Sequence, residues 1–346
     1  MVLALAKEIE MRKSEFQDDV VETIYFGGGT PSILTIEDLR LLIDAVYSNY
    51  KVVKNPEITV EANPDDLSKE RIIELSNTKI NRLSIGIQSF FEDDLMMMNR
   101  AHNSVEAKEC LEFATQYFDN ISVDLIYGIP EMSNKKWLQN IDTALSFTIP
   151  HISSYALTVE PKTALHTFIQ KGIIPQPDDE VAQEHFQILV DKLSENGFIH
   201  YELSNFGKEN YFSKNNSSYW LGKKYIGIGP SAHSYDGEKR GWNVSNNALY
   251  LKSISENKLP SETEILTKTD RYNEYVMTGL RTIWGISLDR IENEFGTTYL
   301  DYLKLQSEKY IENHLLFIEE NILRTTKKGK FLSDGISSAL FLLNLE

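Results

Sequence analysis

The chain has 346 residues, enough for one barrel-sized domain and a smaller appendage. Its formal net charge of −16 argues against a nucleic-acid partner, because binding phosphates requires a basic surface. The sequence contains neither an apolar run long enough to span a membrane nor the pattern of a signal peptide at residues 1–10, so we expect a cytoplasmic protein.

The first 205 residues alternate between helix-like and strand-like segments, beginning with a helix at 2–13. Repeated βα units with short connections predict a parallel sheet with helices outside it. The fold class expected is α/β, an incomplete (β/α)6 barrel. Strands are predicted at 22–26, 57–62, 82–88, 121–127, 152–159 and 200–204, and amphipathic helices at 36–50, 69–76, 104–117, 134–147 and 180–196.

The alternation fades after residue 205. A loop is predicted at 207–218, followed by a turn-rich stretch at 225–234. Helices at 270–280, 288–295 and 299–314, with short strands at 317–324 and 330–332, then predict a winged-helix-like α+β module. Arginine is not concentrated in the helix 299–314, so DNA binding is not expected. The domains expected are a partial barrel at 1–205, a connecting region at 206–265 and a C-terminal domain at 266–346.

Three glycines, Gly27, Gly28 and Gly29, follow the first predicted strand and precede Thr30 and Pro31. Glycine tolerates a positive φ and lets a ligand approach the backbone closely. Parallel sheets bind ligands at the carboxyl ends of their strands. The run therefore predicts a site for a small anionic or zwitterionic ligand, with a plain tight turn as the alternative.

Polar residues also occur at or near the ends of later strands. Glu61 and Gln88 close the second and third strands, and Asp124 lies within the fourth. Strands covered on both faces should be almost wholly apolar, so each of these groups needs a partner. We expect them to face one cavity, where Arg100 pairs with a ligand carboxylate. The alternatives are satisfied buried hydrogen bonds for the first three and a surface position for Arg100.

Several motifs together resemble one family. The chain resembles the radical S-adenosylmethionine proteins of the oxygen-independent coproporphyrinogen III oxidase group, and most closely its shorter branch of heme chaperones. The resemblance covers essentially the whole length. It is carried by GGGTPS at 27–32, VEANP at 60–64, SIGIQS at 84–89, NRAH at 99–102, VDLIYG at 123–128, YELSNF at 201–206 and GIGPSAHS at 227–234.

The resemblance implies two groups of residues that bind S-adenosylmethionine. Gly28 and Glu61 match positions for a first molecule. A carboxylate there suits the ammonium of the methionine moiety. The positions that match a second molecule are Gly29, Thr30, Gln88, Arg100 and Asp124.

The family's reaction needs a [4Fe–4S] cluster held by a Cys-x3-Cys-x2-Cys loop after the first strand. That loop is absent from this sequence, whose one cysteine, Cys110, falls in the predicted helix 104–117 and is interpreted as a packing residue. No metal ligands are therefore assigned. Because the helix 2–13 resembles the one that follows the cluster loop, two explanations stay open: a truncated chain or misassigned start, and a descendant without the cluster. As written, the chain is not expected to perform radical chemistry.

The heme-chaperone branch usually carries His-Asn-x-x-Tyr-Trp, whereas this chain has Asn215 and Asn216 ahead of Tyr219 and Trp220. An imidazole is a strong axial ligand for heme iron and an amide is not, so position 215 is a poor ligand. The remaining candidates for heme contact are His102 and His233 as ligands, with Tyr219 and Trp220 as apolar faces beside Trp242.

The function implied by the resemblance is that of a heme chaperone, which binds heme and S-adenosylmethionine and delivers heme to a respiratory protein. Two alternatives are an oxygen-independent coproporphyrinogen III oxidase, which needs the missing cysteines, and a noncatalytic remnant without the cluster.

Overall fold

The computed structural model describes residues 1–16 and 19–343. It divides into two compact units. The sheet unit comprises Thr23–Ile36 and Glu57–Ser213, and the terminal unit comprises Met1–Glu22, Glu37–Pro56 and the chain from Lys214 onward.

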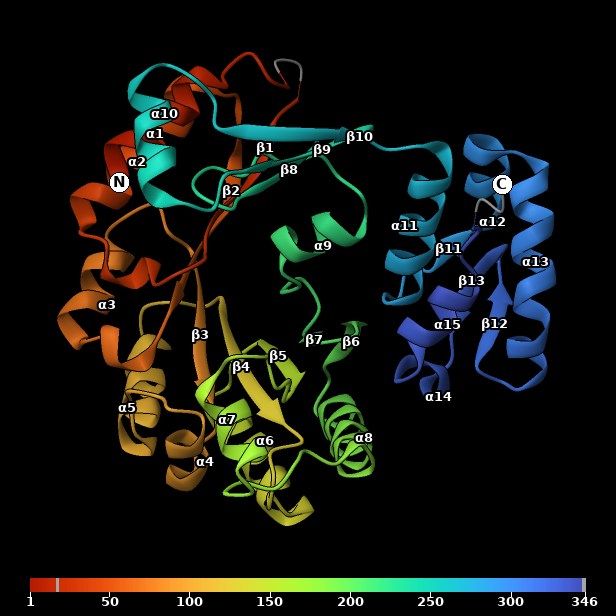
Figure 1. The fold of residues 1–346 in the computed structure, drawn as a ribbon. Coiled ribbons are helices and arrows are strands. Elements are labelled where there is room, and N and C mark those ends of the chain that lie inside the picture. The colour runs from red at the N-terminus through yellow and green to blue at the C-terminus, as the bar shows by residue number, and fades with distance from the viewer. Residues whose placement is uncertain (17–18, 344–346) are drawn as a thin grey trace. The chain divides into compact units, whose positions relative to one another are not determined.

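A seven-stranded sheet, in the order β1-β2-β3-β4-β5-β7-β6, forms the centre of the first of these units (Figure 1). The pairs β2–β3, β3–β4 and β4–β5 are parallel, which confirms the expected α/β half-barrel. Its strands are β1 (Val21–Phe26), β2 (Val52–Ala62), β3 (Arg82–Gln88), β4 (Ile121–Tyr127), β5 (His151–Ala156), β6 (Ile199–Glu202) and β7 (Asn205–Gly207).

The sheet differs from the prediction at its last strands. The predicted strand 200–204 is β6, which pairs with β7 rather than with β5. Strand β7 is antiparallel to both neighbours, so it lies between two strands of the same direction. A three-residue strand carries too little periodicity to be found from sequence.

Helices cover the outer side of β3–β5, as Figure 1 shows for α3, α5, α6 and α8. Polar side chains cap their N-termini: Asn103 makes a capping box with Glu106 at the start of α5, and Ser133 accepts from the Lys136 amide at the start of α6. The elements are η1 (Pro31–Ile33), η2 (Pro64–Asp66), α3 (Lys69–Ser76), α4 (Glu92–Met97), α5 (Ser104–Ala114), α6 (Asn134–Ser146), α7 (Ala164–Gln170) and α8 (Asp179–Glu195).

The part of the terminal unit that precedes residue 266 contains a three-stranded sheet, in the order β10-β9-β8, that the sequence did not predict. The prediction of a loop at 207–218 is wrong over residues 214–218, because helix α9 begins at Lys214. These strands are short and β10 is exposed throughout, so they lack an apolar pattern. The elements are α1 (Val2–Met11), α2 (Ile36–Asn49), α9 (Lys214–Trp220), β8 (His233–Tyr235), β9 (Lys239–Asn243), α10 (Asn247–Ser255) and β10 (Ser261–Ile265).

A buried carboxylate ties α1 to the segment that carries the GIGPSAHS motif. Glu8 is fully buried and accepts hydrogen bonds from the Gly229 amide (2.8 Å), the Asn243 side chain (2.7 Å) and the Tyr250 hydroxyl (2.5 Å). One turn later, Arg12 donates to the Gly227 carbonyl (2.8 Å). Because a buried charge is tolerated only when it is fully paired, these contacts fix the motif segment against α1.

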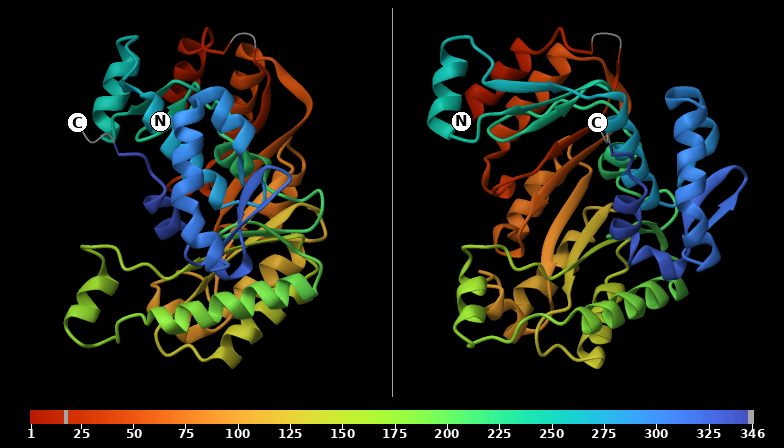
Figure 2. Two further views of the ribbon diagram at one scale, coloured as in Figure 1. Left: turned by 90° about the vertical axis from the view of Figure 1, so that its right-hand side faces the viewer. Right: turned by 45° about the vertical axis from the view of Figure 1, so that its right-hand side comes forward.

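The last part of the terminal unit has the predicted winged-helix-like arrangement, a small sheet in the order β11-β13-β12 with helices around a core that includes Val276, Ile291 and Leu323. Figure 2 shows the β12–β13 hairpin beside α13. The elements are α11 (Lys268–Leu280), β11 (Ile286–Ser287), α12 (Leu288–Arg290), the π-helix η3 (Ile291–Phe295), α13 (Thr297–Glu312), β12 (Leu316–Glu319), β13 (Ile322–Thr325), α14 (Lys327–Lys330) and α15 (Ser333–Ala339).

Two strand predictions need correction in this part. The predicted strand 317–324 is a hairpin, because Glu320 and Asn321 take positive φ values of 50° and 62° and turn the chain. The predicted strand 330–332 is wrong: Thr326 caps the helix α14, and its hydroxyl accepts from the Gly329 amide. Within residues 1–16 and 19–343, none of the helices combines the length and apolar character needed to cross a membrane.

The Glu8 contacts predict a large loss of stability on truncation. Glu8→Ala removes one acceptor shared by three buried donors, of which only Asn243 keeps another, the Gly229 carbonyl, and should lower the free energy of unfolding by about 3 to 5 kcal/mol. Urea denaturation followed by circular dichroism measures this. The control is Glu10→Ala, an exposed glutamate on the same helix. Equal midpoints for the two variants would contradict the role given to Glu8.

Candidate functional site

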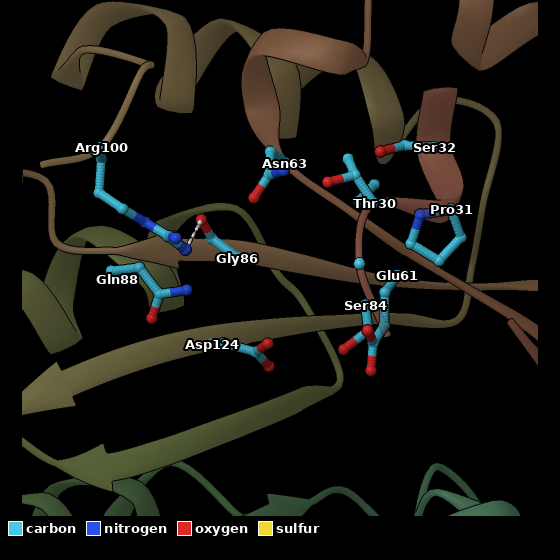
Figure 3. A pocket seen from close by; sticks show the side chains of 12 residues that line it. Thr30, Pro31, Ser32, Glu61, Asn63, Ser84, Gly86, Gln88, Arg100 and Asp124 are labelled. Carbon is cyan, nitrogen blue, oxygen red and sulfur yellow. Dashed lines mark hydrogen bonds between the residues drawn. The ribbon is translucent and has the colours of Figure 1, made fainter. Parts of the chain in front are cut away.

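A polar pocket opens in the sheet unit beside the ends of β2 and β3 (Figure 3). The residues come from the glycine loop after β1, the end of β2, strand β3, the segment after α4 and strand β4. The lining comprises Gly29, Thr30, Pro31, Ser32, Glu61, Ala62, Asn63, Ser84, Gly86, Gln88, Arg100 and Asp124.

The glycine loop is held to β2 by Glu61. This carboxylate accepts from the Tyr25 hydroxyl (2.6 Å) and from the Gly28 amide (3.1 Å). Gly28 and Gly29 have φ values of +74° and +64°, which favour glycine. At Gly27 a Cβ would lie 2.6 Å from the Tyr25 ring and 3.0 Å from Glu61 Oε1. The loop therefore needs glycine here, because Glu61 and Tyr25 occupy the space of a side chain.

Strand β3 presents one face of alternate residues to the pocket. Ser84, Gly86 and Gln88 are spaced by two and line the pocket from the same face of the strand. Gln88 has φ = +67° where the pairing of β3 with β4 shifts register. Such strain at a non-glycine residue is typical of functional sites. A Cβ at Gly86 would lie 2.8 Å from the Gln88 amide nitrogen and 3.1 Å from Arg100 Nη2, so glycine lets both side chains enter the pocket.

An ionisable base and an ionisable acid, Arg100 and Asp124, reach the pocket from different elements (Figure 3). Arg100 follows α4 and donates from Nη2 to the Gly86 carbonyl (3.4 Å). Burial lowers the pKa of Arg100, opposed by the carboxylates of Asp124 and Asp65. Burial raises the pKa of Asp124 to about 7, and the nearby Glu61 carboxylate acts in the same direction, whereas Ser153, Arg82 and Arg100 act against it.

A chain of buried hydrogen bonds begins behind Asp124. Ser153, its register partner on β5, contacts Ser122 (3.2 Å), and Ser122 contacts His151 Nδ1 (2.7 Å). His151 Nε2 lies 2.8 Å from the Tyr201 hydroxyl. Burial and the charge of Arg82 lower the pKa of His151 well below its usual value, so the ring is neutral.

Most of the residues predicted for ligand binding meet in this pocket. Gly29, Thr30, Glu61, Gln88, Arg100 and Asp124 line it, and Gly28 adjoins it through its bond to Glu61. Sequence reasoning missed Tyr25, Asn63, Ser84 and Gly86. The period of two along β3 indicates Ser84 and Gly86 once Gln88 is known to face the pocket.

The residues predicted for heme contact are divided between the two units. In the sheet unit, His102 is buried, with Nε2 3.1 Å from the Ile87 carbonyl and Nδ1 3.7 Å from Asp65. The terminal unit contains the other three. His233 is exposed on β8, with its ring 6.4 Å from that of Trp242, and Tyr219 and Trp220 end α9.

The residues present do not fit an iron–sulfur cluster. Cys110 is buried in α5, and burial raises the pKa of its thiol to about 12, so the thiolate that binds metals is disfavoured. Among the residues that the structure describes, no group of three or more His, Cys, Asp or Glu side chains is arranged to hold a metal ion.

The raised pKa of Asp124 predicts a pH-dependent stability. The folded state keeps a proton on Asp124 that the unfolded state releases near the usual pKa of 3.8. The contribution of this proton to the free energy of unfolding is therefore complete below about pH 4 and is lost as the pH rises toward about 7. Asp124→Asn cannot lose that proton. Its stability relative to the original chain should therefore rise by about 2 to 3 kcal/mol between about pH 5 and pH 8.

Urea unfolding of both proteins at each pH measures this difference, with exposed Asp119→Asn as control. A difference that does not change with pH would contradict the assignment.

Comparison with known proteins identifies the family. Residues 4–144 match the radical SAM superfamily and residues 266–332 the HemN C-terminal domain. The chain is 35% identical to the heme chaperone HemW of Bacillus subtilis (92% of this chain, 85% of the relative), and 33% identical to that of Lactococcus lactis (95% and 90%). The structure of coproporphyrinogen III oxidase (HemN) from Escherichia coli superposes with a TM-score of 0.83 at 21% identity, covering 98% of this chain and 82% of the other, which shows a shared fold. The chain therefore belongs to the HemW family of radical SAM proteins.

Proposed function

We propose that this protein is a heme chaperone, which binds heme and passes it to a respiratory protein. The observation that carries the proposal is the similarity along nearly the whole chain to relatives named heme chaperone HemW. Heme is the cargo in this function, so its binding must be reversible and its site must be accessible at the protein surface.

The second part of the proposal is that the pocket of the sheet unit binds S-adenosylmethionine. This ligand carries a carboxylate, an ammonium, a sulfonium and ribose hydroxyls. Two buried polar atoms on pocket-lining residues, Arg100 Nε and Asp124 Oδ1, have no hydrogen-bond partner, which fits a site completed by a polar ligand. Glu61 suits the ammonium, and Arg100 suits the carboxylate.

The expected residues of the first and second S-adenosylmethionine molecules adjoin or line the same pocket. Gly28 and Glu61 are assigned to the first molecule, and Gly29, Thr30, Gln88, Arg100 and Asp124 to the second. Bound S-adenosylmethionine supplies an adenosyl group on a positively charged sulfur. Because the residues of this chain do not fit the [4Fe–4S] cluster, no radical step is assigned to it.

Heme contact is assigned to the terminal unit. Tyr219 is 45% exposed, and Trp220 and the exposed His233 belong to the same unit. Flat aromatic side chains suit the face of a porphyrin, and an exposed imidazole suits its iron. His102 is a poorer candidate, because a ligand role would break its buried contact with the Ile87 carbonyl and open the core around it.

Titration with hemin, followed by visible absorption, tests the heme proposal. We expect saturable binding that Trp220→Ala weakens by up to about tenfold, since the loss of an aromatic face costs about 0.5 to 1.5 kcal/mol. Tyr117→Ala, which removes an exposed tyrosine of the sheet unit, is the matched control and should bind as the original chain does. An absence of saturable binding would overturn the proposal.

Calorimetric titration with S-adenosylmethionine tests the pocket. Glu61→Ala removes a charged acceptor and should weaken binding by about 1 to 3 kcal/mol, roughly five- to 150-fold in the dissociation constant. The control is Glu37→Ala on α2, an exposed glutamate outside the pocket. An affinity that Glu61→Ala leaves unchanged would remove Glu61 from the site.

A further inference from the structure

An arginine stacks on the tryptophan assigned to heme contact. The guanidinium of Arg281, at the C-terminal end of α11, lies 5.0 Å from the centre of the Trp220 ring on α9. Beside Trp220, the side chains of Tyr219 and Leu221 are 45% and 41% exposed. The terminal unit thus places a fixed positive charge next to exposed apolar surface, in a chain with a net charge of −16.

Arg281 is paired with an acidic residue that a ligand can displace. Its Nη1 lies 2.6 Å from Asp334 Oδ1 on α15. The Asp334 side chain is 66% exposed, whereas that of Arg281 is 20% exposed. Asp334 is the solvated partner of this pair, so the release of its carboxylate into water costs little. A ligand carboxylate can therefore replace Asp334 at small cost, while Arg281 stays in place against the indole.

Other aromatic rings of the terminal unit also contact one another or a guanidinium group. The Tyr219 ring packs edge-on against Tyr225 (4.6 Å), and Tyr225 lies 6.3 Å from Tyr235. Further along, Arg290 lies 4.2 Å above the ring of Tyr275. The contact with Tyr225 orients the Tyr219 ring on α9, so that less side-chain entropy is lost when a flat ligand binds there.

We infer that Arg281 holds a propionate carboxylate of the heme whose ring lies against Trp220 and its exposed neighbours on α9. The inference rests on the proposed heme function and adds a residue that selects for the carboxylates of the porphyrin. An arginine fork recognises a carboxylate in a bidentate manner, and stacking on an aromatic ring fixes the plane of the fork. Asp334 occupies the carboxylate position when heme is absent, so it competes with the propionate.

The test compares hemin with its dimethyl ester, which keeps the macrocycle and iron but has no free carboxylate. Arg281→Gln should weaken hemin binding about tenfold and leave binding of the ester unchanged. Asp334→Asn removes the competitor and should strengthen hemin binding severalfold, again without effect on the ester. The control is Arg40→Gln, which removes the same charge from an exposed position on α2 and should alter neither ligand.

The outcomes separate this inference from the proposal on which it rests. If the original chain binds neither hemin nor its ester, both fall. If it binds hemin but Arg281→Gln retains full affinity, only the inference falls. If Arg281→Gln weakens hemin and ester equally, the arginine merely supports Trp220 and the inference is also overturned. Urea denaturation of each variant shows whether it is folded, and Asp334→Asn tests the idea without touching the arginine.

Discussion

The contact of the Glu61 carboxylate with the glycine loop is the constraint on which the candidate site depends. One oxygen of Glu61 accepts from Tyr25 on β1 and the other from the Gly28 amide, so a single side chain joins the loop to the second strand. The loop passes so close to Glu61 and Tyr25 that a Cβ at Gly27 would crowd both side chains. Because the loop is fixed in this way, Gly29 and Thr30 line the pocket opposite the polar residues of β3 and β4.

Burial determines the chemistry of that pocket. Asp124 and Arg100 are removed from water, which raises the pKa of the acid and lowers that of the base. The charged form of each side chain therefore costs desolvation free energy. Behind them, Ser153, Ser122 and His151 satisfy one another in a buried chain of hydrogen bonds. Arg100 Nε and Asp124 Oδ1, on residues that line the pocket, have no hydrogen-bond partner within the protein. The polar interior of the sheet unit is thus kept at a cost in stability.

A different buried carboxylate organises the terminal unit. Glu8 and Arg12 on α1 hold the segment 227–234, which leads into β8 and the exposed His233. Trp220 is in turn held by Arg281 from α11. The segment that carries His233 is therefore held by residues more than 200 positions earlier in the sequence, whereas Trp220 is held by a residue of its own C-terminal half. The proposed S-adenosylmethionine site lies in the sheet unit and depends on Glu61. The proposed heme site lies in the terminal unit and depends on Arg281.

The sequence pattern predicted the half-barrel, and most of the residues that it assigned to ligand binding line one pocket. Apolar runs of five to seven residues alternate with amphipathic helices, and that periodicity reflects local burial. Glu61, Gln88 and Asp124 stood out because polar groups in covered strands require partners. Other features could be found only once the chain was folded. Strands β7 to β10 are too short or too exposed to leave a pattern, and Tyr25, Glu8 and Arg281 acquire their roles from partners far away in the chain. Such pairings depend on where the backbone returns in space, which no local spacing of residues encodes.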